Sequence, residues 1–425
     1  MKFPFFILFV LLQSCIQFVN NKNMGIHETW VISWGSSQND VPGDITLDSF
    51  QNIYVAGVTY GNIACKNKGE ADIFLCKTDS SGKQLWIKQW GTKHRENVNG
   101  VTVGKQGFIY VAGSTNGNLD LNKNAGGYDI FLTKLDTAGN VKWTFQWGTQ
   151  WDDCINAIDI DTNGNIFLAG YSTANITNRK NNQSENNAQI CLLKINDTGK
   201  IIWKKQWGTK APESATSIKI SKSRNIYICG WTQGELEKKH QIEFDDIFIS
   251  KLDSNGNVIW TRQWGTDNND EAYSLCLDAD ENVYITGRLG EPRTNVRLRH
   301  DDAFICKYDS SGNKIWSKKL GTPNDDVGKN IVCQANKIFI YGSTYGKMKN
   351  CRKNGYADVF LLTLSPKGKI LLSKQWGTGQ FTYSGACEIK QSKIYLCGDI
   401  SAELNGNPTK FNRRKVFLSK WKILY

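Results

Sequence analysis

A seven-residue segment returns along the chain at an almost constant spacing. Its clearest copies, at 86–92, 143–149, 203–209 and 260–266, all read W-x-x-Q-W-G-T, and altered copies occupy 30–36, 316–322 and 372–378. The second aromatic or apolar anchor of the segment falls at 34, 90, 147, 207, 264, 320 and 376. Self-similarity at such a period is typical of solenoids, propellers and arrays, so it constrains the fold before composition does.

Each repeat contains four short apolar runs. In the second repeat they lie at 101–103, 108–113, 129–136 and 141–143, with β-branched and aromatic residues separated by Gly, Asn and Asp turns. No run has the 3.6-residue period of an amphipathic helix. Seven units of four strands predict an all-β fold, a seven-bladed β-propeller of four-stranded antiparallel blades.

The two ends of the repeat region are complementary. The chain enters on residues 29–34, which match the fourth strand of a repeat, and leaves on 416–421, which match the third strand. We therefore expect the N-terminal strand to complete the last blade, because that pairing would remove two exposed sheet edges. The predicted propeller domain covers 29–425.

The repeated pattern resembles a known family. The residues D-I-F-L-x-K-x-D-x-x-G-x-x-x-W-x-K-Q-W-G-T, together with N-I-Y-V-A-G, are similar to the bacterial SBBP β-propeller repeat over nearly all of 29–421. The resemblance implies the propeller fold. It implies no particular activity, because the family shares none.

The first residues differ from the repeats. Lys2 precedes an apolar run at 3–12, and Leu-Gln-Ser then leads to Cys15. This pattern predicts a signal peptide at 1–14, too short to span a bilayer, and it resembles a bacterial lipobox. Lipidation of Cys15 would make 15–28 a tether and the protein an outer-membrane or cell-surface lipoprotein of the bacterial envelope, held to the membrane by its lipid alone. The alternative is an ordinary signal peptide that is cut nearby.

The twelve cysteines do not form a metal-binding pattern, because no C-x-x-C occurs. Cys76 and Cys306 occupy the same third-strand position, while Cys276 and Cys333 lie in or beside first strands. Small, mostly buried positions of this kind commonly hold free cysteine. We therefore expect no structural disulfide.

One face of the propeller is predicted to bind a ligand. The loops between second and third strands and those between blades emerge on the same face, and they are long and divergent. Blades five to seven place basic residues there side by side, and the net charge of +12 predicts an anionic glycan as partner, or a protein ligand. The basic candidates are Arg293, Arg297, Arg299, Lys347, Lys349, Arg352, Lys353, Arg413 and Arg414.

Two alternatives bear on this basic sector. It is equally compatible with a solvated surface. Nucleic acid is not predicted as a partner of an exported protein, because no stacking aromatic array accompanies the arginines.

The motif tryptophans are expected to pack between blades, whereas Trp151 and Trp231 lie outside the motif and are candidates for ligand contact.

A ring of acidic residues stands six residues beyond each anchor. Its members are Asp40, Glu96, Asp153, Glu213, Asp270 and Asp326, with Thr382 at the seventh place. Such a ring has two interpretations: a calcium site, or a carboxylate that accepts backbone N–H groups once in each blade. Recurrence in nearly every blade favours architecture, and no other cofactor is predicted.

Catalytic motifs are absent from the sequence. It contains no G-x-S-x-G, no H-E-x-x-H and no phosphate-binding glycine loop, and its four histidines occupy unrelated repeat positions. The sequence thus predicts no catalytic residue and no enzyme, but a monomeric binding or adhesion module at the envelope that uses its long-loop face. The alternatives are an envelope enzyme with its site at the channel mouth and a purely structural envelope component.

Overall fold

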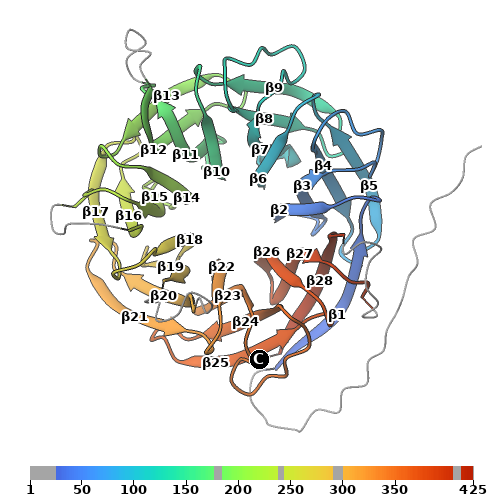
Figure 1. Ribbon diagram of the computed structural model, residues 1–425, viewed down its shortest axis with the longest axis vertical. Helices are drawn as coiled ribbons and strands as arrows, with labels where there is room; N and C mark the ends of the chain where they lie inside the picture. Colours follow the sequence, from blue (N-terminus) through green and yellow to red (C-terminus); the bar gives the residue numbers. More distant parts are fainter. Residues whose placement is uncertain (1–24, 177–183, 238–243, 291–299, 405–412, 425) are drawn as a thin grey trace, which may run out of the picture.

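Seven four-stranded antiparallel sheets surround a central channel (Figure 1). The computed structural model describes residues 25–176, 184–237, 244–290, 300–404 and 413–424. The predicted all-β, seven-bladed propeller is confirmed. Within the described residues the only helical turn is Lys105–Gly107, and no helix there is long and apolar enough to cross a membrane.

The blades follow one another in chain order, each with its first strand at the channel. Blade one consists of β2 (Asp40–Leu47), β3 (Ile53–Thr59), β4 (Asp72–Thr78) and β5 (Gln84–Trp90). Blade two consists of β6 (Glu96–Val103), β7 (Ile109–Thr115), β8 (Asp129–Leu135) and β9 (Val141–Trp147). Blade three consists of β10 (Asp153–Ile160), β11 (Ile166–Ala174), β12 (Ser184–Ile195) and β13 (Ile201–Trp207). Blade four consists of β14 (Glu213–Ile220), β15 (Ile226–Thr232), β16 (Asp246–Leu252) and β17 (Val258–Trp264). Blade five consists of β18 (Glu271–Leu277), β19 (Val283–Leu289), β20 (Asp302–Tyr308) and β21 (Lys314–Leu320). Blade six consists of β22 (Asp326–Gln334), β23 (Lys337–Thr344), β24 (Asp358–Leu364) and β25 (Ile370–Trp376).

Blade seven joins the two ends of the chain. It contains β26 (Thr382–Lys390), β27 (Lys393–Ile400), β28 (Lys415–Leu424) and, as its outermost strand, β1 (Gly25–Trp34). Strand β1 pairs antiparallel with β28, with Trp34 opposite Val416, so the predicted closure is confirmed. Strand β1 begins before residue 29, so part of the predicted tether is strand.

The motif tryptophans pack between blades, as predicted. The ring of Trp86 lies 6.1 Å from that of Tyr54, and its indole Nε1 donates to the carbonyl of Thr137 in the next blade at 3.3 Å. Trp260 of blade four and Trp316 of blade five make the equivalent bonds to carbonyls of the next blade, those of Ser310 and Pro366. A repeated tryptophan thus joins each of these blades to its neighbour, because the half-buried indole finds both apolar contact and an acceptor.

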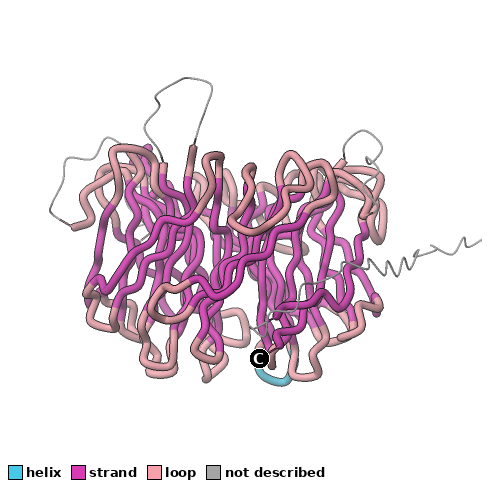
Figure 2. The backbone as a smooth tube through the Cα atoms, turned by 90° about the horizontal axis from the view of Figure 1, so that it is seen from below, coloured by secondary structure: helices cyan, strands magenta, loops and turns pink. Residues whose placement is uncertain are grey.

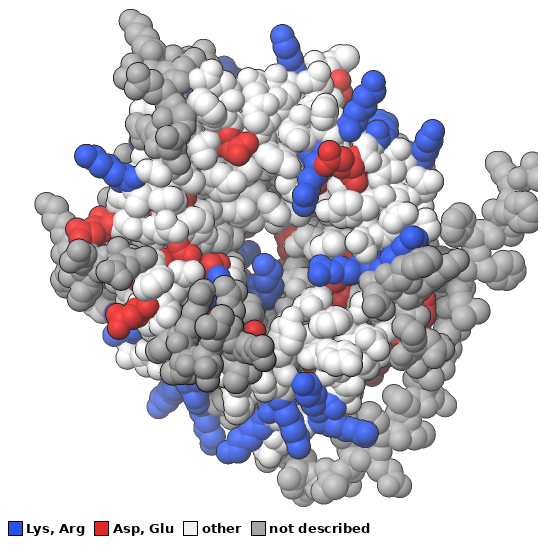
Figure 3. Space-filling model, viewed as in Figure 1, with Lys and Arg blue, Asp and Glu red and all other residues white. Residues whose placement is uncertain are grey.

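The two faces of the disc differ (Figure 2). One face carries short turns, in which an aspartate such as Asp136 accepts the backbone N–H groups of Ala138 and Asn140 at 3.0 and 2.9 Å. Gly139 in this turn has a φ of 80°, which favours glycine. The opposite face carries the long loops, as the sequence predicted, and it is the one seen in Figure 3.

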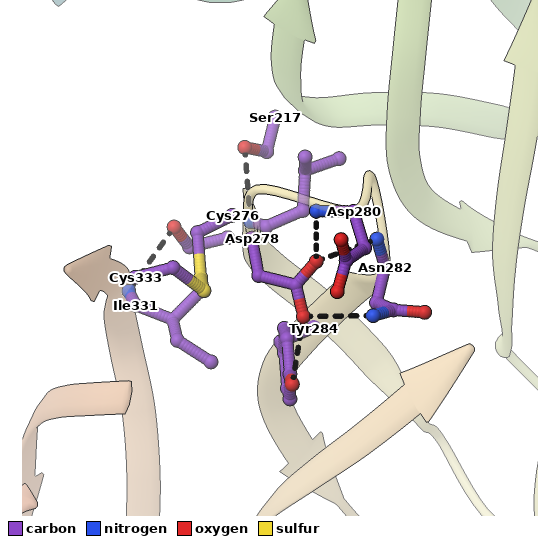
Figure 4. Close-up of a disulfide and its surroundings, with 10 residues drawn as sticks. Ser217, Cys276, Asp278, Asp280, Asn282, Tyr284, Ile331 and Cys333 are labelled. Atoms are coloured by element: carbon purple, nitrogen blue, oxygen red, sulfur yellow. Dashed lines mark hydrogen bonds between the residues drawn. A yellow bond between two sulfur atoms is a disulfide. The ribbon is translucent and has the colours of Figure 1, made fainter. Parts of the chain in front are cut away.

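A disulfide joins Cys276 of β18 to Cys333 of β22, so the expectation of no structural disulfide was wrong (Figure 4). The innermost strands of neighbouring blades converge on the channel, and the two Cα atoms lie 5.7 Å apart. The separation of 57 residues equals one repeat, a signal that could have identified the pair. The other nine described cysteines are free, as expected.

Candidate ligand-binding surface

The ring of acidic residues fastens the connections between blades. Glu96 is fully buried, and its carboxylate accepts the backbone N–H of Thr92 at 3.0 Å, the Thr92 hydroxyl at 2.7 Å and the Thr115 hydroxyl at 2.8 Å. Asp153 repeats this arrangement with Thr149 and Ser172. Each carboxylate thereby holds the W-G-T turn of one blade against the second strand of the next.

The remaining ring positions have the same role. Asp40, Glu213, Asp270 and Asp326 are also fully buried and accept bonds from the residue four positions earlier. Burial raises the pKa of these carboxyls, that of Asp270 to about 6. Among the described residues no group of three or more His, Cys, Asp or Glu side chains lies close enough to hold a metal ion. The bonds from each carboxylate to the connection between blades therefore favour the architectural interpretation.

A basic loop lies on the long-loop face of blade six. Between β23 and β24, the side chains of Lys347, Lys349, Arg352 and Lys353 are all exposed. Basic side chains gather at the lower edge of Figure 3, over the blade β22–β25. The predicted Arg293, Arg297 and Arg299 of blade five lie outside the described residues.

The basic loop is connected to blade seven through two tyrosines. Lys353 Nζ donates to the carbonyl of Tyr345 at 2.7 Å, and the hydroxyls of Tyr345 and Tyr383 lie 3.1 Å apart. The guanidinium of Arg414 lies 5.1 Å from the centre of the Tyr383 ring and 3.4 Å from the carboxylate of Asp399. The structure thus connects Lys353 of blade six with Arg414 of blade seven through Tyr345 and Tyr383.

A row of aromatic rings runs beside these cations. The rings of Tyr356 and Phe381 stack at 5.6 Å with an angle of 22°, and those of Phe381 and Tyr383 stack at 5.9 Å with an angle of 16°. Tyr356 is 63% exposed and Phe381 36%. We call Tyr345, Tyr356, Phe381 and Tyr383 the aromatic strip.

The aromatic strip corrects the sequence analysis, which found no stacking array beside the arginines. Its members come from three loops or strand ends and from two blades, so their proximity depends on the tertiary fold. One signal was available: Phe381 and Tyr383 flank Thr382, the one ring position without a carboxylate. Residues two apart in an extended chain point to the same side.

This arrangement has the chemistry of a site for a charged sugar polymer. Exposed ring faces offer flat apolar area of the kind that lines ligand sites, with few polar groups to fix orientation. Guanidinium and ammonium groups bind carboxylate and sulfate oxygens through charge-assisted hydrogen bonds. A row of rings with cations along one side suits an extended anionic chain better than a compact ligand.

The two predicted tryptophans lie in different places. Trp151 is 41% exposed in the connection before β10, and its backbone N–H donates to the hydroxyl of Thr149 at 3.2 Å. Trp231 lies on β15 and lines the central channel. Neither belongs to the aromatic strip.

The central channel has a volume of about 710 Å³ and charged walls. In one part of it, the carboxylates of Asp44, Asp159 and Glu388 act on the ammonium of Lys219, and Asp159 contributes most to raising the pKa of that lysine. Burial raises the pKa of Asp44 to about 6 and that of Glu388 to about 7. Asp44 and Asp159 also accept backbone N–H groups of the next blade, at 2.9 and 2.7 Å.

Comparison with known proteins places the repeat in a family. Residues 32–64 and 85–120 match the model of the SBBP β-propeller repeat. A stretch of 174 residues is 25% identical to Regulatory protein FlaEY of Caulobacter vibrioides, covering 37% of this chain and 18% of that protein. A stretch of 137 residues is 25% identical to an uncharacterized WD repeat-containing protein, L264, of Acanthamoeba polyphaga mimivirus, covering 28% and 10%. The chain spans less than a fifth of the length of either relative.

Several solved structures have a similar fold. The WD40 domain of Pan2 from Neurospora crassa superposes with a TM-score of 0.52 at 10% identity, covering 95% of this chain and 96% of that one. A polysaccharide lyase, PL25 ulvan lyase bound to -[GlcA(1-4)Rha3S]-, gives 0.51 at 10% identity, covering 86% and 93%. The polysaccharide lyase Uly1 gives 0.54 at 9% identity, covering 93% and 99%. At these identities the likeness concerns the fold alone.

Proposed function

We propose that this chain, two segments of which match the SBBP β-propeller repeat, has a binding function in which the long-loop face holds an anionic polysaccharide. The observation that carries the proposal is the aromatic strip beside the basic loop of blade six and Arg414. Rings bind the apolar faces of successive sugars, while the cations bind their acidic groups. A similar propeller that binds an acidic sugar fragment supports the idea that this fold can present such a surface.

Retention of the purified protein on immobilised dextran sulfate, with uncharged dextran as the matched matrix, tests the proposal. We expect retention on the sulfated matrix alone, and weaker retention as salt rises. The double variant Tyr356→Ala/Phe381→Ala should bind at least about 10-fold more weakly, a loss of about 1.4 kcal/mol, because it removes two exposed rings that stack on each other. Arg352→Ser/Lys353→Ser should weaken binding and flatten the salt dependence.

Matched controls separate the site from general charge. Tyr60→Ala removes an exposed tyrosine of blade one, and Lys83→Ser/Lys367→Ser removes two exposed lysines from short turns. These variants should bind as the wild type does. Equal retention on both matrices, or equal loss in the control variants, would contradict the proposal and redirect attention to a protein ligand. The alternative, that the protein is an enzyme which cuts the polymer, is tested by measuring new chain ends in the polymer over time. A binding module would leave the length of the polymer unchanged.

We place this binding at the bacterial cell envelope, with the propeller exported and tethered through lipid on Cys15. Two features support this proposal: the lipobox-like sequence before Cys15, which lies outside the described residues, and the Cys276–Cys333 disulfide, since such bonds persist in oxidising compartments.

The lipid anchor has a direct test. Labelling with palmitate in a bacterial host should be lost in Cys15→Ala and kept in Cys65→Ala, which removes an exposed cysteine of the propeller. Labelling that survives Cys15→Ala, or a wild type that takes up no label, would show that the anchor is absent.

A further inference from the structure

One position of the innermost strand is a β-bulge in every blade. The pairing of β6 with β7, for example, shifts between Val98 and Gly100 and leaves Asn99 unpaired. All residues at this bulge position line the channel. In blade order they are Gly43, Asn99, Asn156, Thr216, Tyr273, Lys329 and Gly385. A bulge turns its side chain away from the regular alternation of the strand, so this position controls what the channel presents.

In blades two to four the bulge residue joins the blade to the next one. Asn99 Nδ2 donates to the carbonyl of Ile155 at 2.7 Å, and Asn156 Nδ2 donates to that of Ala215 at 2.9 Å. The Thr216 hydroxyl donates to the carbonyl of the corresponding residue of blade five at 2.6 Å. A short polar side chain at the bulge therefore has an architectural role.

Blades five and six depart from this role. Their bulge residues, Tyr273 and Lys329, are the two largest of the set, and the ammonium of Lys329 lies 4.9 Å from the centre of the Tyr273 ring. Blades seven and one, further round the ring, have glycine at this position. At the bulge position the channel wall is thus bulky and basic in blades five and six, and open in blades seven and one.

Lys329 carries a positive charge beside a network of ion pairs. Glu271, the acid that acts on it, forms an ion pair with Arg288, which also pairs with Asp301 at 3.0 Å. The side chain of Lys329 is reached by water, but the channel wall surrounds it. This enclosure lowers the pKa of Lys329, although the charge of Glu271 acts to raise it. Low-dielectric walls strengthen the field of such a cation inside the channel.

Aromatic and hydrogen-bonding groups of blades three and four also line the channel. Trp231 of blade four and Tyr171 of blade three are half-buried, and both line the channel with Ser214 and Asn156. The volume of about 710 Å³ falls within the usual range for small-molecule sites, which combine aromatic walls with a few polar groups.

We propose that this wall of the channel, formed by Lys329, Tyr273 and Trp231, binds a small sugar acid. Its carboxylate pairs with the ammonium of Lys329, and the apolar face of its ring packs against Trp231. The amide and hydroxyl groups of the same wall bind its hydroxyls. The site is separate from the aromatic strip, which lies on the surface of blades six and seven, and it does not depend on the proposed binding of a polysaccharide there.

Equilibrium dialysis with D-glucuronate, and with D-glucose as its uncharged match, tests the site on the full chain. We expect saturable binding of glucuronate and binding of glucose that is at least about 10-fold weaker, the factor that 1.4 kcal/mol represents. Lys329→Met keeps the length of the side chain and removes its charge, so its affinity for glucuronate should fall to that of the wild type for glucose. Trp231→Ala should weaken the binding of both sugars.

The controls distinguish this site from the surface and from misfolding. Lys83→Met removes an exposed lysine of a short turn, and Tyr60→Ala removes an exposed tyrosine of blade one. Both variants should bind glucuronate as the wild type does. Lys329→Arg keeps the charge and should retain most of the affinity, which separates loss of charge from loss of fold. Wild-type protein that binds neither sugar, or binds both equally, would overturn the proposal without reference to any variant.

Discussion

Replacing Glu96 by alanine is expected to lower the free energy of unfolding by about 3–5 kcal/mol, because it leaves several buried donors without an acceptor. The carboxylate binds one backbone N–H and two hydroxyls, all buried, and joins blade one to blade two. Its removal also leaves a cavity between the blades, which adds to the loss. Urea unfolding followed by tryptophan fluorescence measures the change.

Two further variants make this experiment specific. Glu96→Gln keeps the shape and one acceptor oxygen, so we expect it to be less destabilising than Glu96→Ala. Glu70→Ala removes an exposed carboxylate from the loop between β3 and β4 and should change stability by less than about 0.5 kcal/mol. If Glu96→Ala unfolded at the same urea concentration as Glu70→Ala, the architectural role of the ring would be wrong.

Reduction of the Cys276–Cys333 disulfide is expected to cost about 2–4 kcal/mol of stability, since the bond closes a chain loop that spans one whole repeat. Dithiothreitol should therefore lower the melting temperature of the wild type. The double variant Cys276→Ala/Cys333→Ala should melt near the temperature of the reduced wild type, with or without dithiothreitol.

A buried free cysteine provides the control for the disulfide. Cys229→Ala removes such a residue from β15 and should leave the response to dithiothreitol intact. A double variant that still loses stability on reduction would show that the effect arises elsewhere. Mass spectrometry of the non-reduced protein after proteolysis identifies the linked pair directly.

The positions that recur in every blade and those that depart from the repeat have different roles. Glu96 and its equivalents are buried and bonded within the ring, so they stabilise the fold. The candidate sites lie where a blade breaks the pattern: Thr382 replaces a ring carboxylate between Phe381 and Tyr383, and Lys329 replaces a short polar residue at the bulge. Departures within one chain therefore locate candidate function on a repeated scaffold without reference to other proteins.

The sequence by itself determined the number of blades, the four strands in each, the closure by β1 and the two unlike faces. These features follow from local patterns, namely the repeat period, the alternation of apolar residues and the turn residues, and such patterns are legible without knowing distances between blades. The architectural interpretation of the ring was also available, because a buried acid that recurs with a threonine four residues earlier implies a local bond.

Only the tertiary structure decided the disulfide, the aromatic strip and the wall of the channel. Each depends on how closely different blades approach one another, which the radius of the ring and the bulges of the innermost strands fix. Cys276 and Cys333 meet because two adjacent first strands converge, and Tyr356 meets Phe381 because the loop of one blade lies beside the connection to the next. Periodicity states which residues are equivalent, but distances across the ring are set by packing.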